Sequence, residues 1–365
     1  MSILAFLSLL ILHTTQASPF DPHPHPARSL FFDGWYARTV DHKNNVSFAV
    51  ILGVSQTEQD DDYTQTWLAL LLSTPSHTME TKQVFLNQST VNVISRSNSD
   101  AGALTSFRVE SSDFGYIDVQ DTNATIKAAF PSIGVNIEVS VNNRSAWDPK
   151  APNTDGPESW MRHLSPIVPL HYFVYELGSN SDYRVSIKNS STSDAYTYKG
   201  QGHTHMETNY GKMFPRAWLW AEGMNTDDDT RFVMAWSKLP LADFIPPITT
   251  LGFRSKERNW DMATANLDFF KCKYDSETTK AWWFLEGSAP LLGRKMVVNV
   301  SAPLDSFSDR LYIPTKHGFQ NQSGSIESFV GVASFQLYEL GRLVANHTID
   351  LAALEFGGSY VSNHN

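Results

Sequence analysis

The stretch "GHTHMETNYGKMFPRAWLWAE", residues 202–222, contains two short segments in which side-chain types alternate. In the first, His203, His205 and Glu207 stand at alternate positions. Because alternate side chains of a strand point to the same face, two imidazoles and a carboxylate would lie on one side of a sheet. The segment therefore predicts a strand, and it raises the question of whether these three residues bind a metal.

The second segment, "AWLWAE", predicts another strand with two unlike faces. Trp218, Trp220 and Glu222 share one face, and Leu219 and Ala221 share the other. A carboxyl group surrounded by aromatic rings tends to keep its proton, because desolvation disfavours the charged form. Such a group can act as a general acid at neutral pH.

The rest of the chain has the same strand-like character. Short alternating or β-branched runs such as "SFAVILGV" and "NIEVSV" recur, separated by Gly, Asn, Asp, Ser and Pro, and little of the sequence has a helical period. They form two sets of about eight, on either side of a Pro-rich stretch. We therefore expect an all-β protein of two antiparallel β-barrels or sandwiches, with a domain over 18–145, a connection over 146–165 and a second domain over 166–365.

Composition narrows the classes of partner. The formal net charge is −10 and no Lys/Arg cluster is present, which argues against binding nucleic acid. No stretch after the first residues is long and apolar enough to span a membrane as a helix. Cys272 is the only cysteine, so no intramolecular disulfide can form, and we expect it to be a buried or half-buried strand thiol.

The N-terminal residues have the pattern of a secretory signal. An apolar run over 3–12 is followed by Thr15-Gln16-Ala17, which predicts a signal peptide over 1–17. Eight N-x-S/T triplets suggest a glycosylated protein of the secretory pathway, secreted or held in the ER or vesicle lumen. The predicted glycosylation sites are Asn45, Asn87, Asn123, Asn143, Asn189, Asn299, Asn321 and Asn346.

Motifs of the common cofactor enzymes are absent: there is no G-x-S-x-G, P-loop, dinucleotide glycine fingerprint or C-x-x-C. Instead, acidic residues stand among aromatic ones. In "FFDGWYAR", Asp33 stands close to Trp35 and Tyr36. Farther along the chain, Glu207 and Glu222 likewise stand among aromatic residues. These aromatic walls could stabilise a carbocation. Alternatively, the segments are core strands whose carboxylates cap turns or pair with Arg38 and Arg216.

Three segments resemble the tocopherol cyclase family. Residues 31–36, "FFDGWY", match its F-F-[ED]-G-W-Y segment, and residues 207–222 follow its E-K-N-W-G-x-x-F-P-x-x-W-x-W-x-Q segment. "LEFGG" at 354–358 resembles its L-E-V-G-G. The segments keep the family's order and rough spacing. Departures are Thr208 for Lys, Tyr210 for Trp and Glu222 for Gln, and a secretory signal replaces a chloroplast transit peptide, so tocopherol itself is not the expected substrate.

The resemblance implies two lipocalin-like β domains with an apolar pocket, and a cofactor-free ring closure on a prenylated phenol or polyene. Protonation of an alkene would be followed by capture of the cation by a phenolic oxygen, although related folds also catalyse pericyclic reactions. The expected general acid is Asp33 or Glu207, with Glu222 as a second carboxyl group. The expected substrate-binding residues are Trp35, Tyr36, Asn209, Tyr210, Trp218, Trp220 and, outside the motifs, His171.

Two other functions remain open on the sequence. A lipocalin-like carrier would bind an apolar ligand in the same pocket without chemistry. A metal-dependent hydrolase or dioxygenase would use His203, His205 and Glu207. The sequence offers no third or fourth ligand in register, and neither histidine belongs to the family motif, so we expect no metal and no cofactor.

Overall fold

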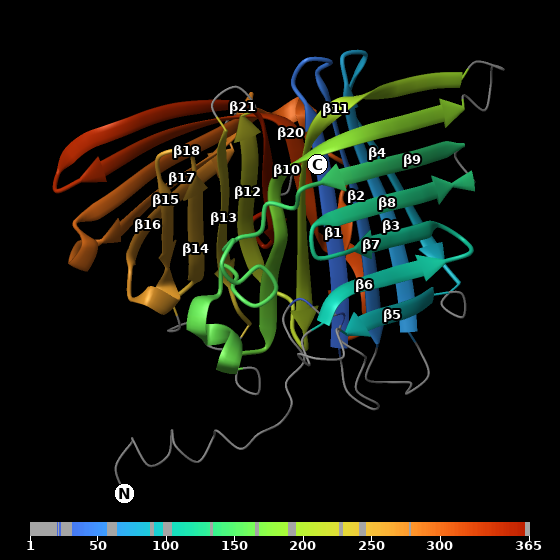
Figure 1. The fold of residues 1–365 in the computed structure, drawn as a ribbon, viewed down its shortest axis with the longest axis horizontal. Coiled ribbons are helices and arrows are strands. Elements are labelled where there is room, and N and C mark those ends of the chain that lie inside the picture. The colour runs from blue at the N-terminus through green and yellow to red at the C-terminus, as the bar shows by residue number, and fades with distance from the viewer. Residues whose placement is uncertain are drawn as a thin grey trace, which may run out of the picture.

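The computed structural model is built almost entirely from antiparallel β-strands, and its described residues contain short 3₁₀ helices but no α-helix. Figure 1 shows two curled sheets side by side, one drawn mostly in blue to green and the other in yellow to red. This arrangement confirms the expected all-β fold of two lipocalin-like halves. The structure describes residues 20, 22, 31–56, 64–87, 91–97, 104–131, 134–164, 168–188, 195–225, 229–240, 246–276 and 279–361.

The first sheet has eleven strands in the order β4-β3-β2-β1-β11-β10-β9-β8-β7-β6-β5. Neighbours in this order follow one another in the chain, except that β1 pairs with β11. The paired strands β9 and β10 are separated in sequence by the Pro-rich connection. The strands are β1 (Phe31–Asp41), β2 (Val46–Gln56), β3 (Thr64–Thr74), β4 (His77–Leu86), β5 (Val91–Ser97), β6 (Leu104–Ser111), β7 (Gly115–Val119), β8 (Asn123–Phe130), β9 (Val135–Asn142), β10 (Leu170–Lys188) and β11 (Ala195–Gly211).

The second sheet has ten strands in the order β15-β14-β13-β12-β21-β20-β18-β17-β16, with β19 paired to β20. Here β12 pairs with β21, so the strand of the "AWLWAE" segment lies beside the "LEFGG" segment. The strands are β12 (Ala217–Asn225), β13 (Thr230–Lys238), β14 (Ile248–Arg254), β15 (Asn259–Ala263), β16 (Phe269–Ser276), β17 (Lys280–Ala289), β18 (Arg294–Pro303), β19 (Leu311–Thr315), β20 (Gly318–Glu339) and β21 (Arg342–Gly358). The 3₁₀ helices are Ser159–Leu164, Thr264–Asn266, Pro290–Leu292 and Leu304–Ser306.

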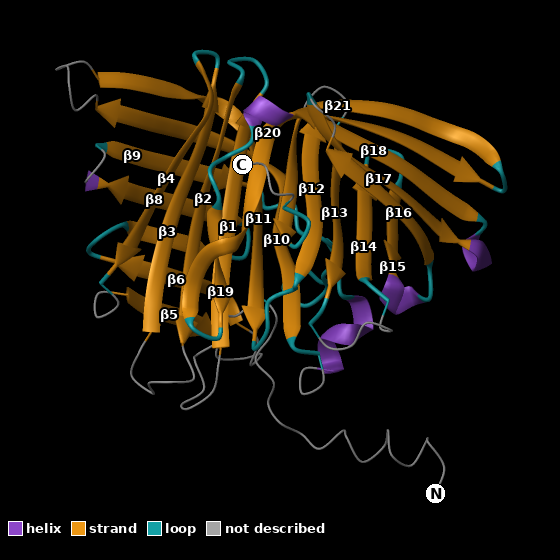
Figure 2. Cartoon of the chain, turned by 180° about the vertical axis from the view of Figure 1, so that it is seen from behind, coloured by secondary structure: helices purple, strands orange, loops and turns teal. Residues whose placement is uncertain are grey.

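The point at which the chain changes sheet differs from the predicted domain boundary. Strands β10 and β11 follow the Pro-rich connection in sequence, yet both belong to the first sheet. The chain passes to the second sheet only after Gly211, in the short link to β12. Pairing of β11 with β1 keeps this segment in the first sheet, and such long-range pairing leaves no mark in local composition. Figure 2 shows β10, β11 and β12 adjacent at the middle of the molecule.

The alternation of side chains along the strands produces three apolar cores. Each curled sheet encloses one core, and a third core lies between the two sheets. In β12, Leu219 and Ala221 enter the core of the second sheet, whereas Trp218 and Trp220 enter the core between the sheets. The two unlike faces predicted for this strand are therefore confirmed, and the face with Trp218, Trp220 and Glu222 meets the other sheet.

Several sequence expectations concern the surface and the termini. Cys272 is half-buried in β16 and accepts a hydrogen bond from Trp283 Nε1 at 3.2 Å, which confirms the predicted strand thiol. No helix among the described residues is long and apolar enough to cross a membrane. The predicted signal peptide and Asn189 lie outside the described residues. The other seven predicted glycosylation asparagines are exposed: Asn45, Asn87, Asn123, Asn143, Asn299, Asn321 and Asn346.

Candidate active site

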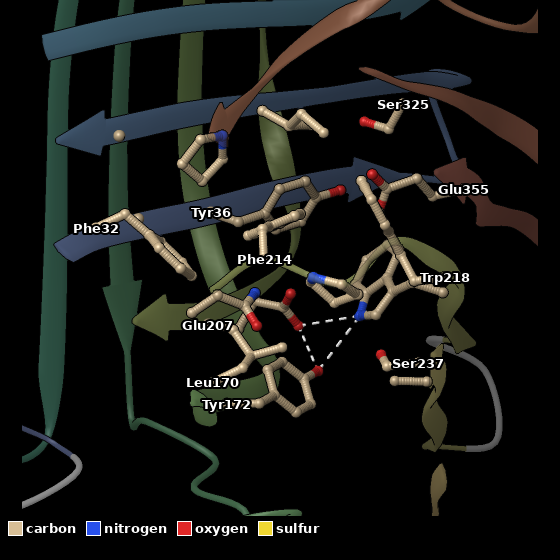
Figure 3. Close-up of a pocket in the computed structure, with 18 of the residues that line it drawn as sticks. Phe32, Tyr36, Leu170, Tyr172, Glu207, Phe214, Trp218, Ser237, Ser325 and Glu355 are labelled. Atoms are coloured by element: carbon tan, nitrogen blue, oxygen red, sulfur yellow. Dashed lines mark hydrogen bonds between the residues drawn. The ribbon is translucent and has the colours of Figure 1, made fainter. Parts of the chain in front are cut away.

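A cavity of about 190 Å³ lies between the two sheets. Its walls come from β1, β2, β3, β10 and β11 on one side and from β12, β13, β14, β20 and β21 on the other, with segments at residues 157–161 and 311–319. Aromatic side chains dominate the walls, and a few carboxyl and hydroxyl groups interrupt them (Figure 3). An apolar cavity with a small number of placed polar groups is the usual form of a small-molecule site.

Glu207 is the centre of a hydrogen-bond network on one wall. Its Oε2 atom receives Tyr172 OH at 2.5 Å and Trp220 Nε1 at 3.2 Å, and it lies 2.8 Å from His205 Nε2. Three donors on one oxygen suit a carboxylate, which can only accept, rather than a carboxylic acid. Figure 3 shows Glu207 and Tyr172 in contact at the cavity wall. Glu207 is thus placed to accept a proton through Tyr172 more readily than to donate one.

The surroundings raise the pKa of both titratable partners of Glu207, Tyr172 and His205. Burial, followed by the Glu207 carboxylate, raises the pKa of Tyr172 well above its ordinary value, so its hydroxyl remains a donor. Burial by itself would lower the pKa of His205, but the hydrogen bond to Glu207 and the charges of Glu207, Glu222 and Glu176 outweigh it and raise that pKa. His205 therefore supports the negative charge of Glu207 from behind the cavity wall.

Two further carboxyl groups line the cavity from the second sheet. Glu327 on β20 and Glu355 on β21 are direct cross-strand partners. Burial raises the pKa of Glu355 to about 7, with a further contribution from Glu207. Burial and the charge of Glu355 raise the pKa of Glu327 well above its ordinary value, although Tyr36 OH donates to Glu327 Oε1 at 2.6 Å. Glu355 is therefore a carboxylic acid that holds its proton close to neutral pH.

Asp33 also lines the cavity, as the sequence predicted for a catalytic carboxyl group. It is buried on β1 and accepts a hydrogen bond from Thr208 Oγ1 at 3.1 Å. Among the predicted binding residues, Trp35, Tyr36, Asn209, Trp218 and Trp220 contribute to the same walls. The structure thus brings two of the three predicted acids together with five of the seven predicted binding residues.

Glu222 lies elsewhere. It is fully buried and forms an ion pair with Arg38 of β1, and neither residue is among the described residues of the cavity wall. Arg38 also donates to the carbonyl oxygen of Leu351 on β21 and to Ser47 Oγ at 3.0 Å. This ion pair is the pairing with Arg38 that the sequence left open, and it joins the two sheets beside the cavity. Glu222 therefore has a structural contact and no direct access to a ligand in the cavity.

His171 and Tyr210 lie next to the site without being among the described residues of its wall. Their rings stack with centroids 5.0 Å apart, and His171 Nδ1 is 3.0 Å from Glu158 Oε2. Glu158 also accepts the backbone N–H of Tyr172 at 2.7 Å. The pair therefore positions Tyr172 and Glu158, which do line the cavity.

The metal alternative finds no ligand set among the residues that the structure describes. No group of three or more His, Cys, Asp or Glu there is arranged to hold a metal ion. His205 bonds to Glu207, while the pKa of His203 is lowered by burial and by Arg231, His42 being a lesser cause. The alternation of His203, His205 and Glu207 therefore produces one hydrogen-bonded pair and one separate histidine.

Sequence reasoning missed Tyr172, Glu327 and Glu355. Glu355 stands inside the quoted "LEFGG" segment, so its motif position was a usable signal. Tyr172 is next to His171 in "VPLHYF", and only the strand register shows which of the two side chains points to the cavity. Glu327, in "SIESFV", lies in no recognised motif, and its role follows from pairing with β21 alone.

The glycines of "LEFGG" have a steric reason. A Cβ atom on Gly357 would lie 1.9 Å from the indole ring of Trp218, its cross-strand partner. Gly357 thus leaves the space that this ring occupies in the cavity wall. The Trp218 ring on β12 can therefore occupy its place in the cavity wall only because a glycine on β21, far away in the sequence, lies opposite it.

The chain is similar to one protein family and to several solved structures. A family model described as "Tocopherol cyclase-like" matches residues 29–358. Among solved structures, one of CghA with Sch210972 has a TM-score of 0.57 at 11% identity, covering 93% of this chain and 95% of that chain. Kievitone hydratase from Nectria haematococca has a TM-score of 0.47 at 10% identity, covering 90% and 89%. No curated protein matches the chain.

Proposed function

The chain belongs to the tocopherol cyclase-like family, and from that premise we propose that it is a cofactor-independent cyclase or isomerase of the secretory pathway. It closes a ring on an apolar prenylated phenol or polyene bound between the two sheets. The observation that carries the proposal is the pair of unlike carboxyl groups in one aromatic cavity. Glu355 holds a proton near neutral pH, and Glu207 accepts hydrogen bonds from Tyr172 and Trp220 and contacts His205 Nε2.

The two groups divide the chemistry of a ring closure. Glu355 donates its proton to an alkene carbon, and the cation that forms is stabilised by the faces of Trp218 and Trp220. The phenolic oxygen then bonds to the cationic carbon and loses its proton to Glu207 through the Tyr172 hydroxyl. One proton enters at carbon and one leaves from oxygen, so the product is an isomer of the substrate. In active sites, an acid–base pair typically consists of two titratable groups to which different surroundings give different proton affinities.

The cavity contributes by holding the flexible chain in a reactive shape. An intramolecular reaction between well-placed groups gains much of its rate from this preorganisation. The same contribution would serve a pericyclic closure, in which no proton is transferred to carbon. The two mechanisms differ in whether solvent hydrogen enters the product.

In the experiment, the protein is incubated with prenylated hydroquinones and linear polyenes in deuterated water. Mass spectrometry detects products isomeric with the substrate and counts carbon-bound deuterium. We expect one deuterium per product, and we expect Glu355→Gln to lose turnover while it still binds the substrate. Glu286→Gln is the matched control, because Glu286 pairs with exposed Lys271 away from the cavity.

The other outcomes are equally informative. An isomer without deuterium would replace acid catalysis with pericyclic preorganisation. A ligand that is retained unchanged across the panel would contradict the proposal and favour an apolar carrier.

A further inference from the structure

We propose that the cavity holds a cationic centre within an apolar ligand, namely a protonated or quaternary amine carried on a hydrocarbon or aromatic chain. The inference deepens the proposed function, because it concerns the same cavity and states the charge of what binds there. It rests on the acidic lining of the walls, on one pair of facing carboxyl groups and on the aromatic side chains around that pair.

The charged residues of the cavity wall are all acidic. Among the residues that the structure describes, no Lys, Arg or His lines the cavity, whereas five acidic residues do: Asp33, Glu158, Glu207, Glu327 and Glu355. A carboxylate or phosphate ligand would have no positive partner in these walls and would face several negative ones. Burial of an unpaired charge is strongly unfavourable, so the walls select against anionic ligands.

Glu327 and Glu355 oppose each other on neighbouring strands. Two carboxylates directly across a strand pair repel each other, and this repulsion is, after burial, a cause of the raised pKa of Glu327. Both side chains line the cavity. Arg38 attracts Glu327 from behind the wall, but it forms its ion pair with Glu222 and does not line the cavity. A ligand with a positive charge beside Glu355 would favour the ionised forms of both carboxyl groups and offset their mutual repulsion.

Aromatic side chains surround the same carboxyl groups. Tyr36 donates to Glu327, and its ring lies 5.2 Å from that of Trp220. Trp218 packs against Gly357 on the strand that carries Glu355. Figure 3 shows Tyr36, Trp218 and Glu355 around one part of the cavity. Ring faces next to carboxylates are the surroundings in which proteins hold ammonium groups, since the ring quadrupole and the charge both attract a cation.

The remaining walls define the rest of the ligand. Ile51, Leu170 and Phe319 are examples of the apolar side chains that extend the cavity away from the carboxyl groups. A cationic head with an apolar tail therefore fits the lining. The proposed cation is a permanent ammonium of the ligand. Mimicry of the transient carbocation in the proposed ring closure is the alternative that turnover tests.

The first test compares three ligands of one shape by calorimetry on the full-length protein. They are 4-phenylbutyl-trimethylammonium, the neutral compound with tert-butyl in place of trimethylammonium, and the corresponding carboxylate. We expect the ammonium compound to bind about tenfold more tightly than the neutral one and the carboxylate to bind least. A neutral compound that binds as tightly as the ammonium compound would overturn the inference.

The second test assigns the preference to named residues. In Glu355→Gln the ammonium compound should lose about tenfold in affinity while the neutral compound keeps its own. Glu286→Gln should leave both affinities unchanged. An equal loss for both compounds would show damage to the cavity rather than loss of a charge, and would count against the assignment.

The wild-type protein supplies a measurement that does not depend on folding of a variant. A quaternary ammonium does not titrate, so a change in its affinity with pH reports on the protein. Affinity should rise with pH through about 7, where Glu355 ionises. The titratable and charged groups around Glu355 are Glu327 on β20, Glu207 on β11 and Tyr36 on β1, with the Arg38–Glu222 pair behind them. A flat or falling profile would contradict the inference.

Turnover distinguishes a permanent ammonium of the substrate from mimicry of a transient carbocation, and it separates this inference from the proposed function. Conversion of an amine-bearing polyene would support a permanent ammonium in the substrate. Inhibition without conversion would show mimicry of the carbocation alone and would count against this inference. A preference for the ammonium compound without any cyclisation would leave this inference standing and remove the proposed function alone.

Discussion

Glu207 and Glu355 line the same cavity but have opposite surroundings. Glu207 Oε2 contacts three donors, whereas the main influence on Glu355 is its burial among other carboxyl groups. The residue type is the same, so the roles follow from the neighbours and not from the side chain itself. Tyr172 connects Glu207 to the cavity.

Tyr172→Phe tests this connection. The substitution removes one hydroxyl that donates to Glu207 at 2.5 Å and keeps the ring. We expect turnover to fall by about 100-fold with little change in substrate affinity, since a positioned proton-transfer group contributes on that order. Steady-state kinetics measure kcat and KM separately. An unchanged kcat would assign Tyr172 to packing.

The buried acids also predict how stability depends on pH. Burial raises the pKa of both Glu355 and Glu176 to about 7, and the neighbouring carboxylates raise that of His205. The folded protein therefore binds more protons than the unfolded chain above about pH 4.5, so stability falls as pH rises through 7. We expect Tm to drop by several degrees between about pH 5 and about pH 8, as measured by calorimetry. Glu176→Gln should flatten this dependence, and a Tm that rises with pH would contradict it.

At the scale of elements, each wall of the site depends on strands that pair from distant parts of the chain. Strand β12 places Trp218 and Trp220 between the sheets, and β21 provides Glu355 together with the glycine that accommodates Trp218. The position of one strand thus fixes the conformation of a side chain on the next.

Gly357→Ala should therefore affect both stability and binding. The added methyl group would overlap the Trp218 ring, and overpacking of this kind costs about 1–3 kcal/mol. Denaturant unfolding measures the stability, and quenching of tryptophan fluorescence by ligand measures the binding. Gly341→Asn is the control, because Gly341 has a φ of 79° in an exposed turn that Asn tolerates. A Gly357→Ala variant as stable and active as the wild type would show that the ring moves freely.

At the scale of the whole molecule, the Arg38–Glu222 ion pair joins the two sheets beside the cavity. Both side chains are fully buried. Removal of one partner leaves an uncompensated charge, whereas removal of both leaves none. The pair therefore fixes how the sheets meet.

A double-mutant cycle distinguishes this role from catalysis. Glu222→Leu alone should cost about 3–5 kcal/mol of unfolding free energy, and the double variant Arg38→Met/Glu222→Leu should cost clearly less than the sum of the single changes. We expect the folded double variant to retain cyclisation. Loss of activity with stability intact would return Glu222 to the list of catalytic groups.

The sequence by itself determined the fold class and the two faces of the strands, because alternation is local and each strand must bury its apolar face. It also predicted Asp33, Glu207 and several aromatic residues of the two motifs as site residues, and of these Asp33, Glu207, Trp35, Tyr36, Trp218 and Trp220 line one cavity. Only the tertiary structure decided that residues 170–211 belong to the first sheet, that Glu222 pairs with Arg38, and that Glu327 and Glu355 line the cavity. Each of these depends on pairing between strands far apart in the chain, and the charge state of a carboxyl group depends on the neighbours that this pairing brings to it.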